Sequence, residues 1–195
     1  MLLKRFNIIK CEGGILKEEK DDVCIEESFS LFFNDSHITD IVASPGNIEE
    51  LGIGFIICEG LSKRIEKVEI YGNSIRVYGK FNKNVGRINS EIEVDSQDII
   101  KYISMIETEE WKKTGGLHCS ALFYEKEFIV RICDISRYNT IDKIAGYAYK
   151  RNVNLSRCIV ASSSRQTSRI IHKLFNAGIP VVISRAAPTD MAIQL

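Results

Sequence analysis

The second half of the chain alternates short apolar runs with longer amphipathic segments, and this alternation restricts the possible folds more than any other feature. Buried strands are predicted at residues 128–133, 157–161 and 179–184. Helices are predicted between them at residues 139–150 and 164–176, and a further helix starts at Pro188. Strands that alternate with helices of this length favour a parallel sheet with right-handed crossovers. Residues 96–195 are therefore predicted to form an α/β domain.

The first half is instead rich in predicted strands. Apolar and β-branched runs at residues 23–33 and 37–42 flank Asn34-Asp35-Ser36, which predicts a hairpin. A second hairpin is predicted from residues 66–71 and 74–78 across Gly72-Asn73.

Two helices complete this outline. Ser44-Pro45 can cap and start a helix that Gly60 ends. Residues 96–107 resemble an amphipathic helix capped by Ser96, with one apolar side formed by Ile99, Ile100, Ile103 and Ile106. The chain is thus predicted to divide into a β-rich N-terminal part with one helix, residues 1–95, and the α/β domain.

Charge and composition exclude several classes of function. Lys plus Arg equals Asp plus Glu, at 26 each, and no basic stripe interleaved with aromatics predicts nucleic-acid binding. The longest apolar stretch, residues 51–58, is too short to cross a membrane, and no signal peptide precedes the polar residues of the start. A cytoplasmic protein is expected. Without a secretion signal, the six cysteines are not expected to form a disulfide framework, and since no two of them are spaced as CxxC, no zinc site is expected.

Polar residues follow each predicted strand of the second half, where ligands bind in open α/β sheets. The first exit carries Asp134, Arg137 and Asn139, and the next two carry Arg165 and Arg185. Three arginines at neighbouring strand ends are expected to converge on one crevice, which favours a phosphorylated small molecule as the ligand.

Each of these positions also has a structural interpretation. Ser163, Ser164 and Arg165 at a helix start suit an anion, yet they equally suit an ordinary N-cap beside a surface arginine. Asp134, Asn139 and Asp142 can be turn and cap residues, and Lys143 can form a structural ion pair with one of them.

The stretch from Thr114 to Ser120 is the most unusual in the chain. Gly115 and Gly116 allow the backbone to approach a ligand closely, and His118 beside Cys119 could lower the pKa of the thiol or share a proton with a substrate. The alternative is a glycine turn that leads to a buried cysteine. Three further cysteines lie in apolar elements and are interpreted as core residues: Cys24, Cys58 and Cys158.

These segments together resemble the FdhD/NarQ family. Thr114-Gly115-Gly116-Leu117-His118 is similar to its TGG-x-H segment, and residues 134–143 are similar to its "EDVGRHNAxDK" signature, with Cys133, Ser136 and Tyr138 in place of Glu, Gly and His. Residues 162–165 are similar to "TSGR" and residues 177–190 to "AGIPVLVSRSAPTD". Upstream, residues 44–60 resemble "TPG…EELALGFLxxEG".

The resemblance implies a cytidine-deaminase-like fold, a three-layer arrangement with helices on both faces of the sheet, in a homodimer. It also implies a sulfurtransferase that acts between a cysteine desulfurase and the molybdenum bis-guanine-dinucleotide cofactor of formate dehydrogenase, with GDP-like nucleotides as mimics of that cofactor. The deaminase zinc signature is missing, so no zinc-activated water is expected.

The chain departs from the family in two places. Family members carry a CxxC loop whose thiolate passes sulfur, whereas the corresponding residues Asn84 to Ser90 contain no cysteine. The family also continues into a further strand beyond the position of Leu195. A non-catalytic chaperone that binds the cofactor or guanine nucleotides is therefore the alternative function.

The candidate residues fall into two groups. The catalytic candidates are Cys119, His118 and Cys133. The cofactor-binding candidates are Thr114, Gly115, Gly116, Asp134, Arg137, Asn139, Asp142, Lys143, Ser163, Ser164, Arg165, Ser184, Arg185, Pro188, Thr189 and Asp190.

Overall fold

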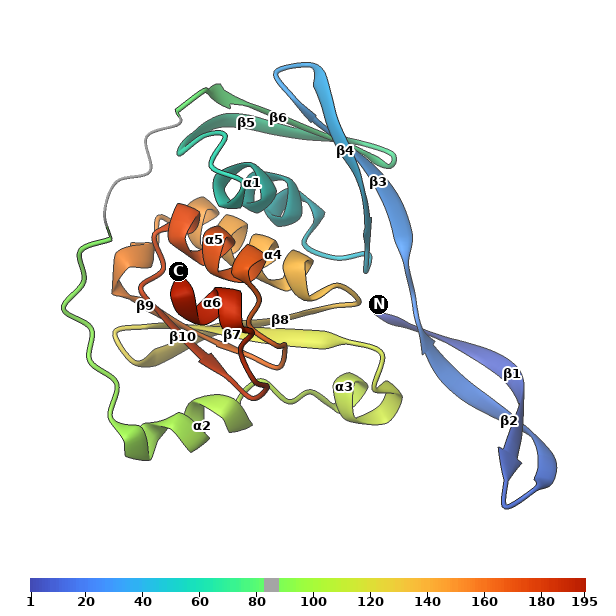
Figure 1. Ribbon diagram of the computed structural model, residues 1–195. Coiled ribbons are helices and arrows are strands. Elements are labelled where there is room, and N and C mark those ends of the chain that lie inside the picture. Colours follow the sequence, from blue (N-terminus) through green and yellow to red (C-terminus); the bar gives the residue numbers. More distant parts are fainter. Residues whose placement is uncertain (83–87) are drawn as a thin grey trace.

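The computed structural model describes residues 1–82 and 88–195, which form a mixed α/β fold with three sheets (Figure 1). The strands are β1 (Leu3–Glu12), β2 (Ile15–Cys24), β3 (Glu27–Phe33), β4 (Ser36–Ala43), β5 (Arg64–Tyr71), β6 (Ser74–Lys80), β7 (His118–Tyr124), β8 (Glu127–Asp134), β9 (Cys158–Ser162) and β10 (Val181–Ser184). The α-helices are α1 (Ile48–Cys58), α2 (Ile99–Ser104), α3 (Glu109–Thr114), α4 (Arg137–Lys150), α5 (Ser168–Ala177) and α6 (Asp190–Gln194). The 3-10 turns η1 (Ser96–Asp98) and η2 (Leu155–Arg157) precede α2 and β9. The mixed α/β class predicted from the sequence is confirmed.

The C-terminal sheet has the strand order β10-β9-β7-β8. β7 is antiparallel to both of its neighbours, so β8, β9 and β10 run in one direction while only β9 and β10 are paired in parallel. The prediction of an uninterrupted parallel sheet is therefore wrong, because β7 is not among the predicted strands. Its sequence signal is the tight turn at Glu125 and Lys126, both with positive φ, which pairs β7 with β8 as a hairpin.

Helices cover both faces of this sheet. α4 and α5 pack on one face against a cluster that includes Leu122, Ile132 and Val160. α2 covers the other face, where Phe123 packs with Ile183 and residues of α2. Leu122 and Phe123 lie on opposite faces because neighbouring side chains alternate along a strand. The likeness to cytidine deaminase and the homodimer stay predictions.

The N-terminal sheet has the order β4-β3-β6-β5, and α1 lies between it and α4 (Figure 1). Both predicted hairpins, β3–β4 and β5–β6, are confirmed by antiparallel pairing. The turn between β3 and β4 places Asn34 and Asp35 at φ values of 48° and 63°, which Asn and Asp tolerate better than most residues. A division at residue 95 stays a prediction.

Two glycines allow α1 and α4 to cross in close contact. A Cβ on Gly54 would clash with the carbonyl oxygen of Asp142, and a Cβ on Gly146 would clash with the carbonyl oxygen of Glu50. The helix backbones therefore touch at this crossing, which joins the two halves of the chain.

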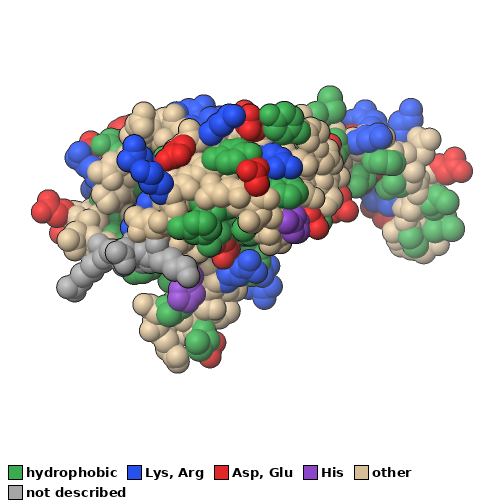
Figure 2. Space-filling view, turned by 90° about the horizontal axis from the view of Figure 1, so that it is seen from above, with side chains coloured by type: hydrophobic (Ala, Val, Ile, Leu, Met, Phe, Trp, Pro, Cys, Tyr) green, Lys and Arg blue, Asp and Glu red, His purple; other side chains and the backbone are tan. Residues whose placement is uncertain are grey.

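A long hairpin of β1 and β2 extends away from the rest of the molecule (Figures 1 and 2). Its strands pair from Leu3 with Cys24 to Glu12 with Ile15, across a turn in which Gly13 and Gly14 both have positive φ. The sequence prediction misses this hairpin and starts a strand at residue 23, which belongs to β2. Its strands are rich in charged residues and largely exposed, so no buried apolar face marks them in the sequence.

Two predicted helices differ in detail. α1 starts at Ile48 rather than at Pro45, because Ser44 is drawn into hydrogen bonds with residues after β8. The segment 96–107 is a 3-10 turn followed by the short α2, capped by Asp95 instead of Ser96. Ile103 and Ile106 pack toward the sheet as predicted, whereas Ile100 is 79% exposed and Tyr102 is buried, so the predicted apolar side is only partly correct. In the described part of the chain, no helix combines the length and apolar character needed to span a bilayer.

The helix crossing generates a prediction about stability. Gly146→Ala should lower the free energy of unfolding by about 3 kcal/mol or more, because the added methyl group meets backbone that has little room to move. Urea denaturation measures this loss. Gly46→Ala is the control, since a Cβ at Gly46 meets nothing within 4 Å and should change stability little. Equal losses in the two variants would contradict the role of the crossing.

Candidate functional site

The carboxyl ends of β8, β9 and β10 and the amino end of β7 lie at one edge of the C-terminal sheet. The register pairs His118 with Asp134 across β7 and β8, and Ser162 with Ser184 across β9 and β10. The three polar strand exits identified in the sequence therefore lie at the same edge. We call this region the functional edge.

Asp134 is completely buried, and its carboxylate accepts hydrogen bonds on both oxygens. Oδ1 accepts from Ser136 N (2.8 Å) and Asn139 Nδ2 (3.0 Å), and Oδ2 accepts from Ser44 N (3.1 Å) and Lys143 Nζ (2.6 Å). Burial lowers the pKa of Lys143, and the Asp134 carboxylate opposes this shift. Because Ser44 follows β4, this network ties the N-terminal sheet to the functional edge. These contacts match the structural interpretation, and cofactor contact by Asp134, Asn139 and Lys143 stays a prediction.

Asp142 is buried and belongs to a second cluster of charged side chains. Lys173 Nζ donates to both Asp142 carboxylate oxygens, at 2.9 and 3.0 Å, and also pairs with Glu59 at 2.7 Å. Burial would lower the pKa of Lys173, but the two carboxylates outweigh it and raise the pKa. Asp142 thus connects α4 with α5 and with the end of α1.

The serine run lies in the connection between β9 and α5, ahead of the helix. α5 begins at Ser168 with Thr167 as its N-cap, so the predicted helix start at Ser164 is wrong. Ser164 is buried and hydrogen-bonded within the run, and Ser163 Oγ accepts from Cys119 N at 3.0 Å. These hydroxyls bind neighbouring strands and hold the connection extended. The helix-dipole argument for phosphate binding therefore does not apply to them.

The three predicted arginines occupy different surroundings. Burial lowers the pKa of His118, and the positive charges of Arg137 and Arg165 lower it further against the opposing field of a nearby carboxylate. These two arginines therefore share the environment of His118. Arg185 instead forms an ion pair with Glu107 at 2.8 Å, beside the segment between α2 and α3. Convergence of the three arginines on one crevice therefore stays a prediction.

A cleft of about 290 Å³ opens between β4, α4 and α5. Tyr138 lies in its wall, with the guanidinium carbons of Arg137 and Arg169 at 4.7 and 5.1 Å from the ring centroid. Burial acts to raise the pKa of Tyr138, but the neighbouring Thr167 hydroxyl and the two guanidinium groups lower it overall. Asn139 and Asp142 also line this cleft.

Three buried polar atoms have no hydrogen-bond partner among the described residues of the functional edge. They are Arg137 Nε, at the start of α4, and Gln166 Oε1 and Thr167 Oγ1, in the connection between β9 and α5. Buried groups of this kind cost free energy until a ligand or water satisfies them. One donor, one acceptor and one hydroxyl group are therefore available to a polar ligand.

The residues at the end of β10 and after it mainly form hydrogen bonds with the connection between β9 and α5. Ser184 Oγ lies 2.8 Å from Ser164 O, and Thr189 N donates to Gln166 O at 2.9 Å. Thr189 precedes the short α6, while Pro188 and Asp190 are exposed. Their predicted contacts with a cofactor remain predictions.

The glycines of the Thr114-Gly115-Gly116 segment have separate roles in the backbone. Thr114 ends α3, and Gly115 is its C-cap in the left-handed conformation at φ 61°, which favours glycine. Gly116 passes close to the sulfur of Cys24, since an added Cβ would lie 2.8 Å from it.

Cys119 and Cys133 are joined by a disulfide, which corrects the expectation that none would form. They are direct partners in the β7–β8 register, with Cα atoms 4.1 Å apart, and such cross-strand pairs bring side chains close together. Both cysteines are buried. A thiolate at either position requires prior reduction of the bond.

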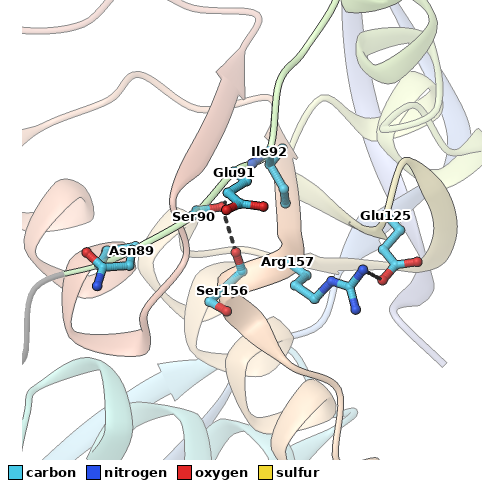
Figure 3. Close-up of a pocket in the computed structure, with 8 residues that line it drawn as sticks. Asn89, Ser90, Glu91, Ile92, Glu125, Ser156 and Arg157 are labelled. Atoms are coloured by element: carbon cyan, nitrogen blue, oxygen red, sulfur yellow. Dashed lines mark hydrogen bonds and ion pairs between the residues drawn. The ribbon is translucent and has the colours of Figure 1, made fainter.

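A hollow of about 740 Å³ lies at the opposite edge of the same sheet (Figure 3). Ser90 Oγ donates to Ser156 O at 2.8 Å, and Arg157 pairs with Glu125. None of the candidate residues lines it. Of the residues that replace the CxxC loop of the family, 84–87 lie outside the described residues and 88–90 border this hollow.

Comparison with known proteins agrees with this arrangement over most of the chain. The model of the FdhD/NarQ family matches residues 72–195. Protein FdhD of Methanocaldococcus jannaschii is 36% identical over 199 residues, covering 100% of this chain and 88% of that protein. This chain belongs to the FdhD/NarQ family.

Other members of the FdhD/NarQ family extend the comparison. A sulfur carrier protein FdhD of Geobacillus kaustophilus is 27% identical over 228 residues, covering 98% of this chain and 87% of its own length. A crystal structure from Desulfotalea psychrophila, described as that of a formate dehydrogenase accessory protein, matches with a TM-score of 0.87 at 22% identity. The match covers 100% of this chain and 87% of the chain in that crystal structure. At 22% identity it shows a likeness of the fold.

Several of the residues that the structure places at the site are not identified by the sequence patterns. Tyr138 is visible in the sequence only as a departure from the family signature, and Gln166 and Arg169 carry no local pattern of their own. Cys24 is predicted as a core residue, yet it is partly exposed. Only the folded chain brings these side chains to the functional edge or beside the disulfide.

The buried ion pair predicts a large effect of a single substitution. Lys143→Met should lower the free energy of unfolding by about 3–5 kcal/mol, because it leaves the buried Asp134 charge without its partner. Urea denaturation at neutral pH measures the change. Lys10→Met, which removes an exposed pair with Glu19 on the β1–β2 hairpin, should change stability little. A similar cost for both variants would contradict the structural role of Lys143.

Proposed function

We propose that this protein is a sulfur carrier that acts in the maturation of formate dehydrogenase. Its curated relatives include proteins named sulfur carrier protein FdhD, and the matching fold is that of a protein described as a formate dehydrogenase accessory protein. The observation that carries the proposal is the grouping of cysteines at the His118 end of β7, because sulfur transfer needs a thiolate that forms a persulfide.

We further propose that the substrate is a phosphorylated pterin dinucleotide, the molybdenum bis-guanine-dinucleotide cofactor. Arg137 and Arg165 supply positive charge at the functional edge, and Arg137 Nε is a buried donor without a protein partner. Gln166 Oε1 is an unsatisfied acceptor that can accept from a base N–H. These groups suit a ligand that carries both phosphate and a heterocycle.

The partners follow from the same proposal. A cysteine desulfurase would donate the sulfur, and formate dehydrogenase would receive the finished cofactor. A homodimer is also proposed.

The alternative is a chaperone that binds the cofactor without transferring sulfur. The disulfide favours this alternative, since Cys119 and Cys133 are not nucleophiles while they are joined. The two functions differ in whether a reduced cysteine acquires sulfur.

Sulfur loading tests the carrier function. The protein is incubated with a cysteine desulfurase and cysteine, both with the Cys119–Cys133 disulfide intact and after reduction, and its intact mass is measured without reductant. The expected result is an increase by the mass of one sulfur atom in the disulfide form, in which no reduced pair can release the sulfur again. The increase is absent when cysteine is omitted. A variant with all six cysteines changed to Ser is the second control. An unchanged mass of the wild-type protein would reject the carrier function and leave the chaperone.

Nucleotide binding tests the ligand. GDP at 100 times its dissociation constant should add about 2.7 kcal/mol of stability, visible as a thermal shift. Arg165→Ala should weaken binding because it removes a charge from the functional edge. Arg157→Ala is the matched control, since Arg157 is an exposed arginine at the opposite edge of the sheet. Equal affinities in both variants would contradict the proposed site.

A further inference from the structure

Three cysteines lie together where the β1–β2 hairpin joins the rest of the protein. Cys119 and Cys133 form the disulfide within a small buried cluster, and Cys24 packs against this cluster together with Trp111. Cys24 is the last residue of β2, which contacts α3 (Figure 1). It is a free cysteine and is partly exposed. A partly exposed free cysteine thus accompanies a buried pair of cysteines.

The Thr114-Gly115-Gly116 segment surrounds the sulfur of Cys24. Cys24 Sγ lies 3.4 Å from Thr114 Oγ1, which also accepts from Gly116 N at 3.2 Å. A Cβ at position 116 would lie only 2.8 Å from that sulfur. The absence of a side chain at Gly116 therefore allows Cys24 Sγ to lie directly against the backbone of this segment.

The remaining cysteines are placed differently. Cys58 and Cys158 are buried; burial raises the pKa of both thiols, that of Cys158 to about 12. Cys11 is exposed on the β1–β2 hairpin. Among the described cysteines, Cys24 alone combines a free thiol, partial exposure and contact with the cluster of the disulfide.

We propose that Cys24 is the sulfur-accepting residue of this protein and that the Cys119–Cys133 pair releases the sulfur from it as sulfide. This inference rests on the proposed carrier function and assigns its chemistry to residues. It also gives the Thr114-Gly115-Gly116 segment a role, as the seat of the acceptor sulfur.

Loading is a transfer between two thiols. The Cys24 thiolate attacks the outer sulfur of a donor persulfide, which forms the S–S bond of a Cys24 persulfide. The S–S bond of the donor breaks, and the donor leaves as a thiolate. No electrons are gained or lost in this exchange as a whole.

Release is a reduction of the carried sulfur. A thiolate of the reduced Cys119–Cys133 pair attacks the inner sulfur of the Cys24 persulfide, expels hydrosulfide and forms a mixed disulfide with Cys24. The second cysteine of the pair then attacks this mixed disulfide, which restores the Cys24 thiolate and closes the Cys119–Cys133 bond. The pair supplies two electrons, and the disulfide in the structure is the spent form. An external dithiol, itself oxidised to a disulfide, reduces the pair for another cycle.

The test uses glutathione persulfide as the donor, so that it does not depend on a desulfurase. The wild-type protein is reduced, freed of reductant and mixed with one equivalent of the donor without oxygen. It should release sulfide and finish with the Cys119–Cys133 disulfide. Cys24→Ser should release no sulfide above a blank without protein. The double variant Cys119→Ser/Cys133→Ser should retain one extra sulfur on the peptide that contains Cys24.

Matched variants separate this chemistry from misfolding. Cys11→Ser removes an exposed cysteine of the same hairpin and should behave like the wild type. Gly116→Ala keeps every cysteine but fills the space beside Cys24 Sγ, so sulfide release should be slower. Each single variant of the pair should accumulate a mixed disulfide between Cys24 and the remaining cysteine.

Two outcomes would overturn the inference. One is sulfide release by Cys24→Ser at the wild-type rate, and the other is extra sulfur that the double variant holds on a peptide without Cys24. If a desulfurase still loads sulfur onto Cys24→Ser, the carrier function stands while the assignment of Cys24 fails. If the desulfurase loads sulfur onto neither the wild-type protein nor any variant, the proposed function itself fails.

Discussion

The buried contact between Asp134 and Lys143 is the interaction on which the rest of the structure depends. A carboxylate and an ammonium group without access to water are stable only when both are paired and hydrogen-bonded, and here Ser44 completes both sets of bonds. Ser44 directly follows β4 of the N-terminal sheet, whereas Asp134 ends β8 and Lys143 lies in α4. The ion pair thus fixes the end of β4 against the strand exit at the functional edge, and the close crossing at Gly54 and Gly146 acts on the same interface.

Because of this ion pair, the short segment after β8 contributes residues both to the protein interior and to the candidate site. The residues after β8 turn inward through Asp134, Asn139 and Lys143, while Arg137 and Tyr138 from the same segment line the outside. A polar cluster in a strand exit can therefore belong partly to the interior and partly to a ligand site. The buried residues of the cluster position the more exposed ones, because the hydrogen bond from Ser136 N to the Asp134 carboxylate fixes the start of α4.

The proposed sulfur chemistry has a different location from the one that the family pattern suggests. Of the residues that replace the CxxC loop, 88–90 border the large hollow at the opposite edge. Three of the six cysteines lie instead near His118, at the ends of β2, β7 and β8. Cys24 is partly exposed, whereas the Cys119–Cys133 pair is buried, and this difference in exposure suits a division between accepting sulfur and releasing it.

The sequence by itself determined the α/β alternation of the second half, the hairpins β3–β4 and β5–β6, and the family, because periodicity, turn residues and motifs are local properties. It also located the strand exits that carry the polar residues. Tertiary structure alone decided that β7 separates β8 from β9, that Arg185 pairs with Glu107, and that Cys24 lies beside the disulfide. The physical reason is that these contacts join residues far apart in the chain, so strand order and side-chain packing set them rather than any local pattern.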